Sequence, residues 1–340
     1  KNKNLSMILN ERLKLNHKTL HGSRDYFQLQ RKEYTFEFIP VLDINDSSQA
    51  LNITDVSPLH RKWVNKHLKN PDEVRLIKKF CRAQNVYGAE SYIKGFSGYV
   101  LEILTVYYGS FNNLVRAVSK WKIPIYIDIA KYYKDQKDAF KKINKSKRAN
   151  KLIIVDPVQK ERNAAAAISN EKIEKFVNAC KNYLHNPSYE FFIEKEQKIS
   201  DLIIESGENK LLIAKIKPMK GKKDVIGSRI LKVYDYLRNK LIKHEFKVVK
   251  HGWYFNNDSF LYYIVKNESL SEKIIHYGPP VKHQKHVEEF KKKYKNHNIS
   301  NGKVCTELKR DIKTLKDFSR IFSKDEYVKT NDKKIRFKIY

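Results

Sequence analysis

Long apolar runs are missing from this sequence. No stretch of its 340 residues approaches the ~18 consecutive apolar residues that a membrane-spanning helix needs, so we expect no membrane partner. Cysteine is scarce as well, since the chain has three, Cys81, Cys180 and Cys305, at spacings that match no metal-binding pattern. A disulfide framework is therefore not expected, and the cysteines favour a reducing compartment, the cytoplasm.

Several compact catalytic motifs are absent too. The sequence has no Gly-rich phosphate-binding loop, no convincing Ser-His-Asp order and no pair of cysteines spaced for zinc. His276, His283 and His286 lie near one another, but their spacing does not match a helical metal pair, so a basic loop facing RNA is the simpler interpretation.

Acidic residues are few beside basic ones. The chain has 38 Asp and Glu against 69 Lys and Arg, a formal net charge of +31, and its hydrophobic content of 41% is enough for real cores. A basic excess spread along the whole length indicates a polyanionic partner. Nucleic acid is the first candidate, because phosphate neutralisation supplies most non-specific affinity, and an anionic membrane surface is the second.

The stretch from 74 to 85 carries the clearest helical pattern in the chain. On a period of 3.6 residues, four cations share one face and four apolar side chains share the opposite one. The cations are Arg75, Lys78, Lys79 and Arg82, and the apolar residues are Val74, Ile77, Phe80 and Cys81. Tyr87 follows at the C-terminal end, beside Gly88. Taken alone, this is also the pattern of an ordinary helix with a solvated basic face.

The remaining periodicity predicts an α+β chain without internal repeats. Helices are expected near 5–20, 72–85, 97–108, 110–121, 169–186, 228–243, 286–294 and 315–322. Strands are expected near 26–29, 34–39, 123–129, 152–155, 210–216, 246–250 and 259–265. The lysine-rich residues 131–151 are expected to form a loop or a local insertion. A hairpin turn is expected at 256–258 and a break in the chain at 277–280.

Single carboxylates at strand positions give only weak signals. Glu37 alternates with apolar residues on an expected strand, where an acid commonly faces solvent. Asp128 and Asp156 stand at strand ends, where Asp commonly caps a turn. Two-metal chemistry needs several carboxylates around ions ~3.5–4 Å apart. Reasoning from the residues alone therefore ends at a basic, multi-domain protein that binds RNA.

A series of short motifs between residues 20 and 190 carries more information. In chain order they read Ser23-Arg24-Asp25-Tyr26-Phe27, Phe36-Glu37-Phe38-Ile39-Pro40-Val41, Asp55-Val56-Ser57-Pro58-Leu59-His60, Glu73-Val74-Arg75-Leu76-Ile77-Lys78-Lys79-Phe80, Val86-Tyr87-Gly88-Ala89-Glu90, Gly95-Phe96-Ser97-Gly98-Tyr99, Tyr108-Gly109-Ser110-Phe111, Asp156-Pro157-Val158 and Arg162-Asn163-Ala164-Ala165-Ala166. Together they resemble the archaeal-type (class I) CCA-adding tRNA nucleotidyltransferases.

The resemblance implies a fold and a reaction. The fold would be a remnant of a polymerase-β-like nucleotidyltransferase palm (1–46), a helical neck (47–121), a mixed body (122–200), an α+β tail (201–300) and a C-terminal segment (301–340) whose return to the body is left open. The reaction would be template-independent addition of CCA to the 3′ end of tRNA from CTP and ATP. The tRNA acceptor arm and the two nucleotides would be the partners.

Site residues follow from the matching motifs. His60, Lys78 and Tyr87 match the family's triphosphate-binding residues, with Lys78 acting as a point charge. Arg162 matches the arginine that reads the Watson–Crick edge of the incoming base, a task suited to a rigid donor fork. Asn163 would help to hold that arginine and the base, so it is also counted as nucleotide-binding.

The metal site implied by the resemblance is incomplete in this sequence. Glu37 takes the place of the family's third metal carboxylate, usually Asp, and is therefore the expected catalytic residue and Mg²⁺ ligand. The family's Gly-Ser motif and Asp-x-Asp pair have no counterpart: Gly22-Ser23 is not followed by such a pair, and Val56 replaces the family's Arg. The two-metal site would be completed by residues outside this chain, which would then be inactive alone.

Three explanations of this gap are open. The sequence, which does not begin with Met, is a fragment of a longer active protein, or one subunit of a split enzyme whose second chain supplies the Asp-x-Asp segment, or a non-catalytic tRNA- or RNA-binding scaffold protein derived from a CCA-adding enzyme. We favour the first two jointly, because the matches of Glu37, His60, Lys78, Tyr87 and Arg162 are all present.

Overall fold

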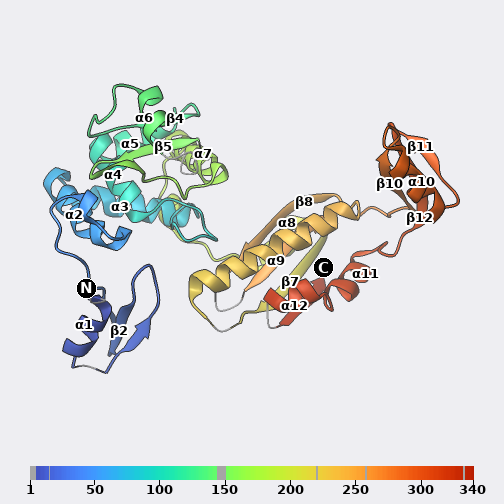
Figure 1. The fold of residues 1–340 in the computed structure, drawn as a ribbon, viewed down its shortest axis with the longest axis horizontal. Coiled ribbons are helices and arrows are strands. Elements are labelled where there is room, and N and C mark those ends of the chain that lie inside the picture. The colour runs from blue at the N-terminus through green and yellow to red at the C-terminus, as the bar shows by residue number, and fades with distance from the viewer. Residues whose placement is uncertain (1–4, 15, 144–150, 220, 257–258, 332–333) are drawn as a thin grey trace. The chain divides into compact units, whose positions relative to one another are not determined.

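The chain divides into two compact units, Lys1–Lys195 and Glu196–Tyr340, each described here by itself. The computed structural model describes residues 5–14, 16–143, 151–219, 221–256, 259–331 and 334–340 (Figure 1). Both units combine helices with strands, which confirms the expected α+β multi-domain class. The finer division into palm remnant, neck, body and tail stays a prediction.

The first unit begins with a small antiparallel sheet. Helix α1 (Leu5–Arg12) precedes β1 (Lys18–Leu20), β2 (Tyr26–Arg31) and β3 (Tyr34–Phe38), in the sheet order β1-β2-β3. The expected helix at 5–20 is thus wrong in its second half, because residues 18–20 pair with β2. The hairpin between β2 and β3 is as expected. It turns at Lys32, whose φ of 51° gives the backbone the twist that a tight hairpin needs.

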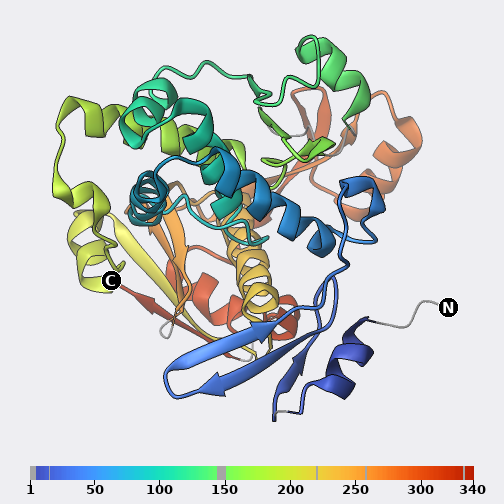
Figure 2. The same ribbon diagram turned by 90° about the vertical axis from the view of Figure 1, so that its left-hand side faces the viewer.

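Four helices follow in sequence: α2 (Ile53–His67), α3 (Pro71–Ala83), α4 (Gly98–Tyr108) and α5 (Phe111–Val118). The residue just before each helix caps it, because its side chain accepts a backbone N–H of the first turn. These capping residues are Asn52, Asn70, Ser97 and Ser110. The apolar face expected for α3 is buried. It shares one core with α4, α5 and α7 (Asn170–His185) (Figure 2).

A three-stranded sheet completes the first unit. Strands β4 (Ile125–Ile127) and β5 (Leu152–Asp156) run parallel, and β6 (Gln159–Asn163) is antiparallel to β5. The expected loop at 131–151 is wrong for α6 (Gln136–Lys142), which buries Ala139 against residues of β5. Residues 144–150 of that segment lie outside the described residues.

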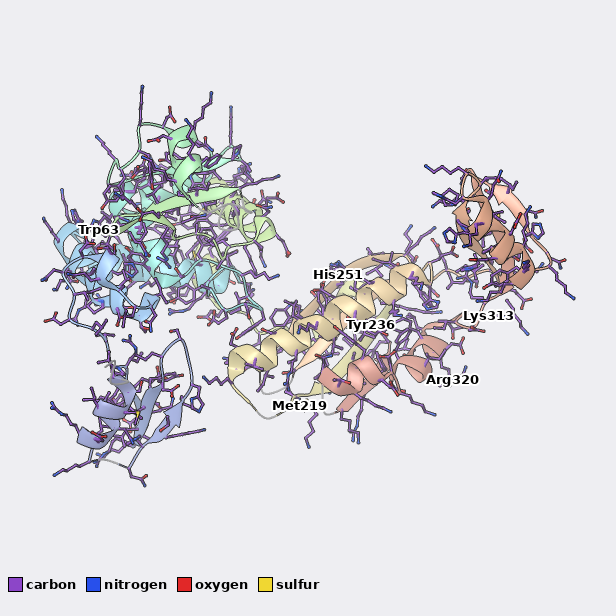
Figure 3. All side chains as sticks on the ribbon, viewed as in Figure 1. Trp63, Met219, Tyr236, His251, Lys313 and Arg320 are labelled. Carbon is purple, nitrogen blue, oxygen red and sulfur yellow. The ribbon has the colours of Figure 1, made fainter. Side chains whose placement is uncertain are left out.

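The second unit contains a four-stranded antiparallel sheet in the order β13-β7-β9-β8. Its strands are β7 (Lys210–Lys217), β8 (Val248–Tyr254), β9 (Phe260–Val265) and β13 (Lys334–Ile339). The long helix α9 (Lys223–Lys243), α11 (Leu315–Phe322) and α12 (Glu326–Asn331) cover one face. The short helix α8 (Ile199–Ser206), which the sequence did not lead us to expect, packs on the other. Tyr236 of α9, labelled in Figure 3, donates a 2.8 Å hydrogen bond to Asp325, just before α12.

One expectation for this sheet differs from the structure, and another is not tested by it. Strand β8 begins at Val248 and ends at Tyr254, later than the expected 246–250. The hairpin turn expected at 256–258 includes Asn257 and Asp258, which lie outside the described residues.

A smaller sheet lies between β9 and α11 in the sequence. It consists of β10 (Lys273–Pro280), β11 (Asn298–Ser300) and β12 (Lys303–Lys309), in the order β10-β12-β11, with α10 (Gln284–Lys293) packed against it. The expected chain break at 277–280 is wrong, since these residues end β10. Proline is tolerated there because β10 is an edge strand and its register shifts between Tyr277 and Pro280. No helix in the described part of the chain is long and apolar enough to cross a membrane.

Candidate nucleotide-binding site

Two side chains from the first unit converge on the first turn of α4. A Cβ atom placed on Gly98 would lie 3.3 Å from the Tyr87 hydroxyl and 3.4 Å from Lys78 Nζ. Gly98 permits this close approach at the N-terminus of an 11-residue helix. A cation, a hydroxyl and the N-terminal end of a helix, where Ser97 already accepts the Val100 amide, together form a surface suited to an anion.

The backbone before α4 fixes the position of Tyr87. Tyr87 forms a parallel bridge with Phe96. The Gly88 amide donates to the Phe96 carbonyl at 2.9 Å, and the Phe96 amide donates to the Val86 carbonyl at 2.7 Å. A Cβ atom on Gly95 would come within 2.3 Å of the Val86 carbonyl oxygen, so only glycine fits there. The Tyr87 ring also carries the Arg82 guanidinium 4.5 Å from its centroid.

Lys78 is already engaged in the structure. Its ammonium lies 2.7 Å from a carboxylate oxygen of Glu102, one turn further along α4, and each side chain is about a quarter exposed. An incoming phosphate must therefore share Lys78 with Glu102 or displace it. The other cations of the α3 face also have partners: Arg75 pairs with Asp72, and Lys79 lies 5.3 Å from the Tyr189 ring centroid.

The second cluster is centred on Asp156, at the end of β5. Its fully buried carboxylate accepts hydrogen bonds from His60 Nε2 at 3.0 Å, the Tyr99 hydroxyl at 3.0 Å, the Val158 amide at 3.0 Å and Arg162 at 2.5 Å. Burial alone would raise the pKa of Asp156. The hydrogen bond and charge of His60, the Val158 amide and the charge of Arg162 outweigh it, so that pKa lies below its ordinary value.

Tyr99 joins the two clusters, because it follows Gly98 in the first turn of α4. Its ring stacks on that of His60 with the centroids 3.9 Å apart and the planes at 28°. Burial and the neighbouring Asp156 carboxylate raise the pKa of the Tyr99 hydroxyl, which therefore stays a hydrogen-bond donor near neutral pH. Four side chains are thus arranged around the first turn of α4. Lys78 and Tyr87 approach it directly. His60 and Arg162 are connected to it through Asp156, which also binds Tyr99.

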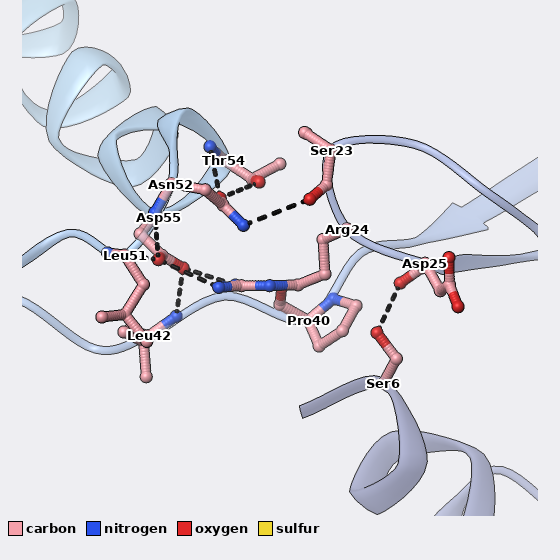
Figure 4. A network of polar contacts seen from close by, with 10 residues as sticks. All are labelled: Ser6, Ser23, Arg24, Asp25, Pro40, Leu42, Leu51, Asn52, Thr54 and Asp55. Atoms are coloured by element: carbon pink, nitrogen blue, oxygen red, sulfur yellow. Dashed lines mark hydrogen bonds and ion pairs between the residues drawn. The ribbon is translucent and has the colours of Figure 1, made fainter. Parts of the chain in front are cut away.

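The helix that carries His60 is tied to the N-terminal sheet by a buried ion pair (Figure 4). Arg24 contacts both carboxylate oxygens of Asp55, at 2.5 and 3.0 Å, and donates to the carbonyl of Pro40 at 2.9 Å. Asp55 also accepts the amides of Leu42 and Leu51 at 2.9 and 3.1 Å. Although burial would raise the pKa of Asp55, these contacts lower it to about 2.

Glu37 lies in a different environment. It is exposed on β3, and its carboxylate accepts a 3.2 Å hydrogen bond from Gln28 on β2. Within the residues that the structure describes, no three His, Cys, Asp or Glu side chains lie close enough together to hold a metal ion. The described residues therefore do not fit a complete two-metal centre.

Asn163 is fully engaged with backbone. Its side-chain oxygen accepts the amides of Ile154 and Ala165, both at 3.0 Å, and its amide nitrogen donates to the carbonyl of Leu152 at 3.2 Å. These bonds join β6 to β5 beside Arg162. The expected part of Asn163 in nucleotide binding stays a prediction.

Three residues of this site were not singled out from the sequence as parts of it: Asp156, Tyr99 and Glu102. Asp156 does cap a local turn through the Val158 amide, as strand-end aspartates commonly do. Its bond to His60 spans 96 positions, which no local pattern reveals. Tyr99 and Glu102 lie on one face of α4 with Gly98, and a polar face at the start of an otherwise apolar helix was the available signal.

Comparison with known proteins identifies two family models in this chain. Residues 72–193 match the second domain of tRNA nucleotidyltransferase, and residues 217–330 match the C-terminal domain of the CCA-adding enzyme. A CCA-adding enzyme of Nanoarchaeum equitans is 31% identical over 335 residues, which cover 97% of this chain and 81% of the relative. One of Methanosarcina barkeri is 30% identical, over 87% of this chain and 66% of the relative. A solved cytoplasmic RNA terminal U-transferase aligns with a TM-score of 0.40 at 12% identity, over 56% of this chain and 76% of the other.

Proposed function

This chain belongs to the CCA-adding enzyme family, and from that membership we propose that it takes part in template-independent addition of C, C and A to the 3′ end of tRNA from CTP and ATP. The observation that supports this most is the convergence on one helical turn. Lys78 and Tyr87 lie against Gly98, while His60 and Arg162 are held beside Tyr99 by Asp156.

Each side chain has a task in this proposal. The Lys78 ammonium neutralises phosphate charge, the Tyr87 hydroxyl donates to a phosphate oxygen, and the α4 amides add a third set of donors. When both ring nitrogens of His60 carry a proton, Nε2 donates to Asp156 and Nδ1 donates to the triphosphate. Arg162 presents its planar fork to the Watson–Crick edge of the incoming base. Because Asp156 holds His60 and Arg162 together, one buried carboxylate sets the distance between the phosphate end and the base end of the nucleotide.

The metal belongs to this proposal as well. We propose that Mg²⁺ is the ion and that Glu37 supplies one ligand, with the remaining carboxylates coming from residues outside these 340, in the same protein or in a second chain. When bound, the ions supply charge neutralisation and an activated tRNA 3′-hydroxyl. A cytoplasmic location completes the proposal, and the three buried free cysteines are compatible with it.

The reaction is tested with tRNA that lacks its 3′-terminal CCA, incubated with Mg²⁺, CTP and ATP. We expect no extension by the chain alone and extension once a Gly-Ser/Asp-x-Asp palm segment is added in trans. Extension by the chain alone would contradict the proposed origin of the metal ligands. A failure of the added segment, with tRNA binding intact, would favour a non-catalytic RNA-binding scaffold.

Base reading is tested separately by Arg162→Ala in the restored enzyme. The variant is expected to lose discrimination for CTP and ATP over UTP and GTP by more than it loses tRNA affinity. An equal loss for all four nucleotides would mean that Arg162 is only structural. Glu161→Ala, next to it on β6 and exposed, is the matched control and should discriminate like the unaltered chain.

A further inference from the structure

Two adjacent tyrosines between β4 and α6 hold the turn that leads into Arg162. The Tyr132 hydroxyl donates to the Pro157 carbonyl at 2.6 Å, and the Tyr133 hydroxyl donates to the Lys160 carbonyl at 2.8 Å. Pro157 is the first residue after β5, and Lys160 is the second residue of β6. The two hydrogen bonds therefore fix the β5–β6 turn at both of its ends, from a segment 25 and 27 positions earlier in the chain.

The pairing of β5 with β6 does not fix this part of β6 by itself. The register shifts after Val155, which lies opposite Asn163, because Asp156 then lies opposite Gln159. In the described part of the chain, the three residues of β6 between these two pairs, Arg162 among them, have no pairing partner on β5. A strand irregularity of this kind re-aims side chains and leaves their backbone to be held by other contacts.

The two tyrosines differ in how far they are buried. Tyr133 is 8% exposed, and its ring packs in a small core with Ile153 and Val155 of β5, whereas Tyr132 is 44% exposed. Burial raises the pKa of both hydroxyls, and the Asp156 carboxylate raises the pKa of Tyr132 further. Both hydroxyls therefore stay protonated and remain donors at neutral pH.

We propose that Tyr132 and Tyr133 are positioning residues for base selection, because they hold the β5–β6 turn from which Arg162 reaches the incoming base. The inference rests on the proposed function, since both tyrosines act through Arg162. Asp156 binds the guanidinium end of Arg162 at 2.5 Å, and the tyrosines hold the backbone from which that side chain starts. A side chain held at both ends is pre-organised, and a small displacement of such a group costs selectivity.

Tyr132→Phe tests the proposal with little risk to the fold, because it removes one hydroxyl from a partly exposed ring. With CCA-less tRNA present, we expect the unaltered chain to bind CTP more tightly than UTP. The variant should lose about threefold to tenfold of this preference, the factor that corresponds to one ordinary hydrogen bond. Tyr133→Phe should lose a similar factor. Isothermal titration calorimetry of the whole chain with each nucleotide measures the ratio of affinities.

The matched control is Tyr263→Phe. It removes another hydrogen bond from a tyrosine hydroxyl to a backbone carbonyl, the 2.9 Å bond to Tyr234 in the core of the second unit. We expect this variant to lower the thermal unfolding midpoint and to keep the preference for CTP. Equal losses of preference in Tyr132→Phe and Tyr263→Phe would reduce the effect to general stability, and the positioning role would be wrong.

Combination with Arg162→Ala shows whether Tyr132 acts through the arginine. If it does, Tyr132→Phe has no further effect on the ratio of affinities once Arg162 is absent. Losses that multiply in the double variant would overturn the proposal.

Failure of the proposed function gives a different result. If the unaltered chain binds CTP and UTP equally, base reading by Arg162 fails, and the positioning role fails with it. If the unaltered chain prefers CTP and both tyrosine variants keep the full preference, the proposed function stands and only the positioning role is wrong.

Discussion

His60 and Asp156 lie 96 positions apart in the chain and are joined by a 3.0 Å hydrogen bond between the ring Nε2 and a fully buried carboxylate oxygen. The bond connects α2 to the end of β5, and Arg162 on β6 binds the same oxygen. In the proposed function, His60 donates to phosphate and Arg162 reads a base, so the two proposed roles share one anchor. Their spacing would then be set before a nucleotide arrives, which would lower the entropy cost of binding.

Asp156→Asn is expected to weaken this anchor. The substitution keeps the shape but removes the charge that faces His60 and Arg162, and an uncompensated buried cation is costly. We expect a loss of about 2–4 kcal/mol in the free energy of unfolding and a loss of CTP affinity of about tenfold. Urea denaturation and CTP titration measure the two effects. Asp128→Asn, at the end of β4, is the control: it should lower stability and leave CTP affinity unchanged. Unchanged CTP affinity in Asp156→Asn would contradict the shared anchor.

Glu102→Gln is expected to strengthen triphosphate binding. In the free chain Glu102 holds Lys78 at 2.7 Å, and a phosphate has to compete with that carboxylate. A partly exposed ion pair is worth up to about 1 kcal/mol, so its removal should tighten CTP binding by about fivefold at most. Lys78→Gln should weaken binding instead. If Glu102→Gln also binds CTP more weakly, Glu102 serves to orient Lys78 and competition is not its main effect.

Two glycine substitutions distinguish an effect on CTP affinity from an effect on stability. Gly98→Ala places a methyl group against the Tyr87 hydroxyl and Lys78 Nζ, both flexible ends, so the fold should tolerate it and gain up to about 1 kcal/mol. CTP affinity should fall about tenfold, because the methyl group displaces the Tyr87 hydroxyl and the Lys78 ammonium, the two groups proposed to bind phosphate. Gly109→Ala meets no atom within 4 Å but has a φ of +85°, so it should cost about 1 kcal/mol of stability and leave CTP affinity unchanged. If both variants bind CTP with similar affinity, Gly98 is not part of the nucleotide-binding site.

The Arg24–Asp55 pair predicts how stability depends on pH. The pKa of Asp55 is about 2 in the folded chain, below its ordinary value of 3.8. The ionised carboxylate therefore stabilises the fold fully above pH 3.8, and this stabilisation is lost as the pH falls toward 2. The contribution is about 2 kcal/mol. We expect the difference in unfolding free energy between the unaltered chain and Asp55→Asn to be constant from pH 7 to 5 and to shrink between pH 4 and 2. A difference that does not change with pH would contradict this account.

Local patterns were sufficient for the regular elements of the fold. Helices α3, α4 and α5 follow from apolar spacing and polar caps, because each buries one stripe against a shared core. The pattern failed for α6, whose seven residues contain four charged side chains and bury only Ala139. It failed again at β10, where Pro279 and Pro280 are permitted only because the strand lies at an edge of its sheet. Edge position is a property of the sheet and is not visible in the segment itself.

The candidate site likewise has parts that local sequence patterns predict and parts that they do not. Lys78 and Tyr87 lie close together in sequence and are brought together by a helix and the turn after it, which is local structure. The role of Asp156 depends on partners on α2, α4 and β6, so its strand-end position suggested only a turn cap. In the second unit, the pairing of Lys217 with Lys334 and of Lys215 with Arg336 depends on the register between β7 and β13, which no single strand specifies.

That register has a consequence for the order of events during synthesis. Strand β7 leaves the ribosome well before β13, with α9, β8, β9 and the small sheet of β10, β11 and β12 between them. The edge of the main sheet formed by Lys334 and Arg336 is therefore added last. The cross-strand neighbours of Lys215 and Lys217 on β13 are therefore absent until β13 has been synthesised.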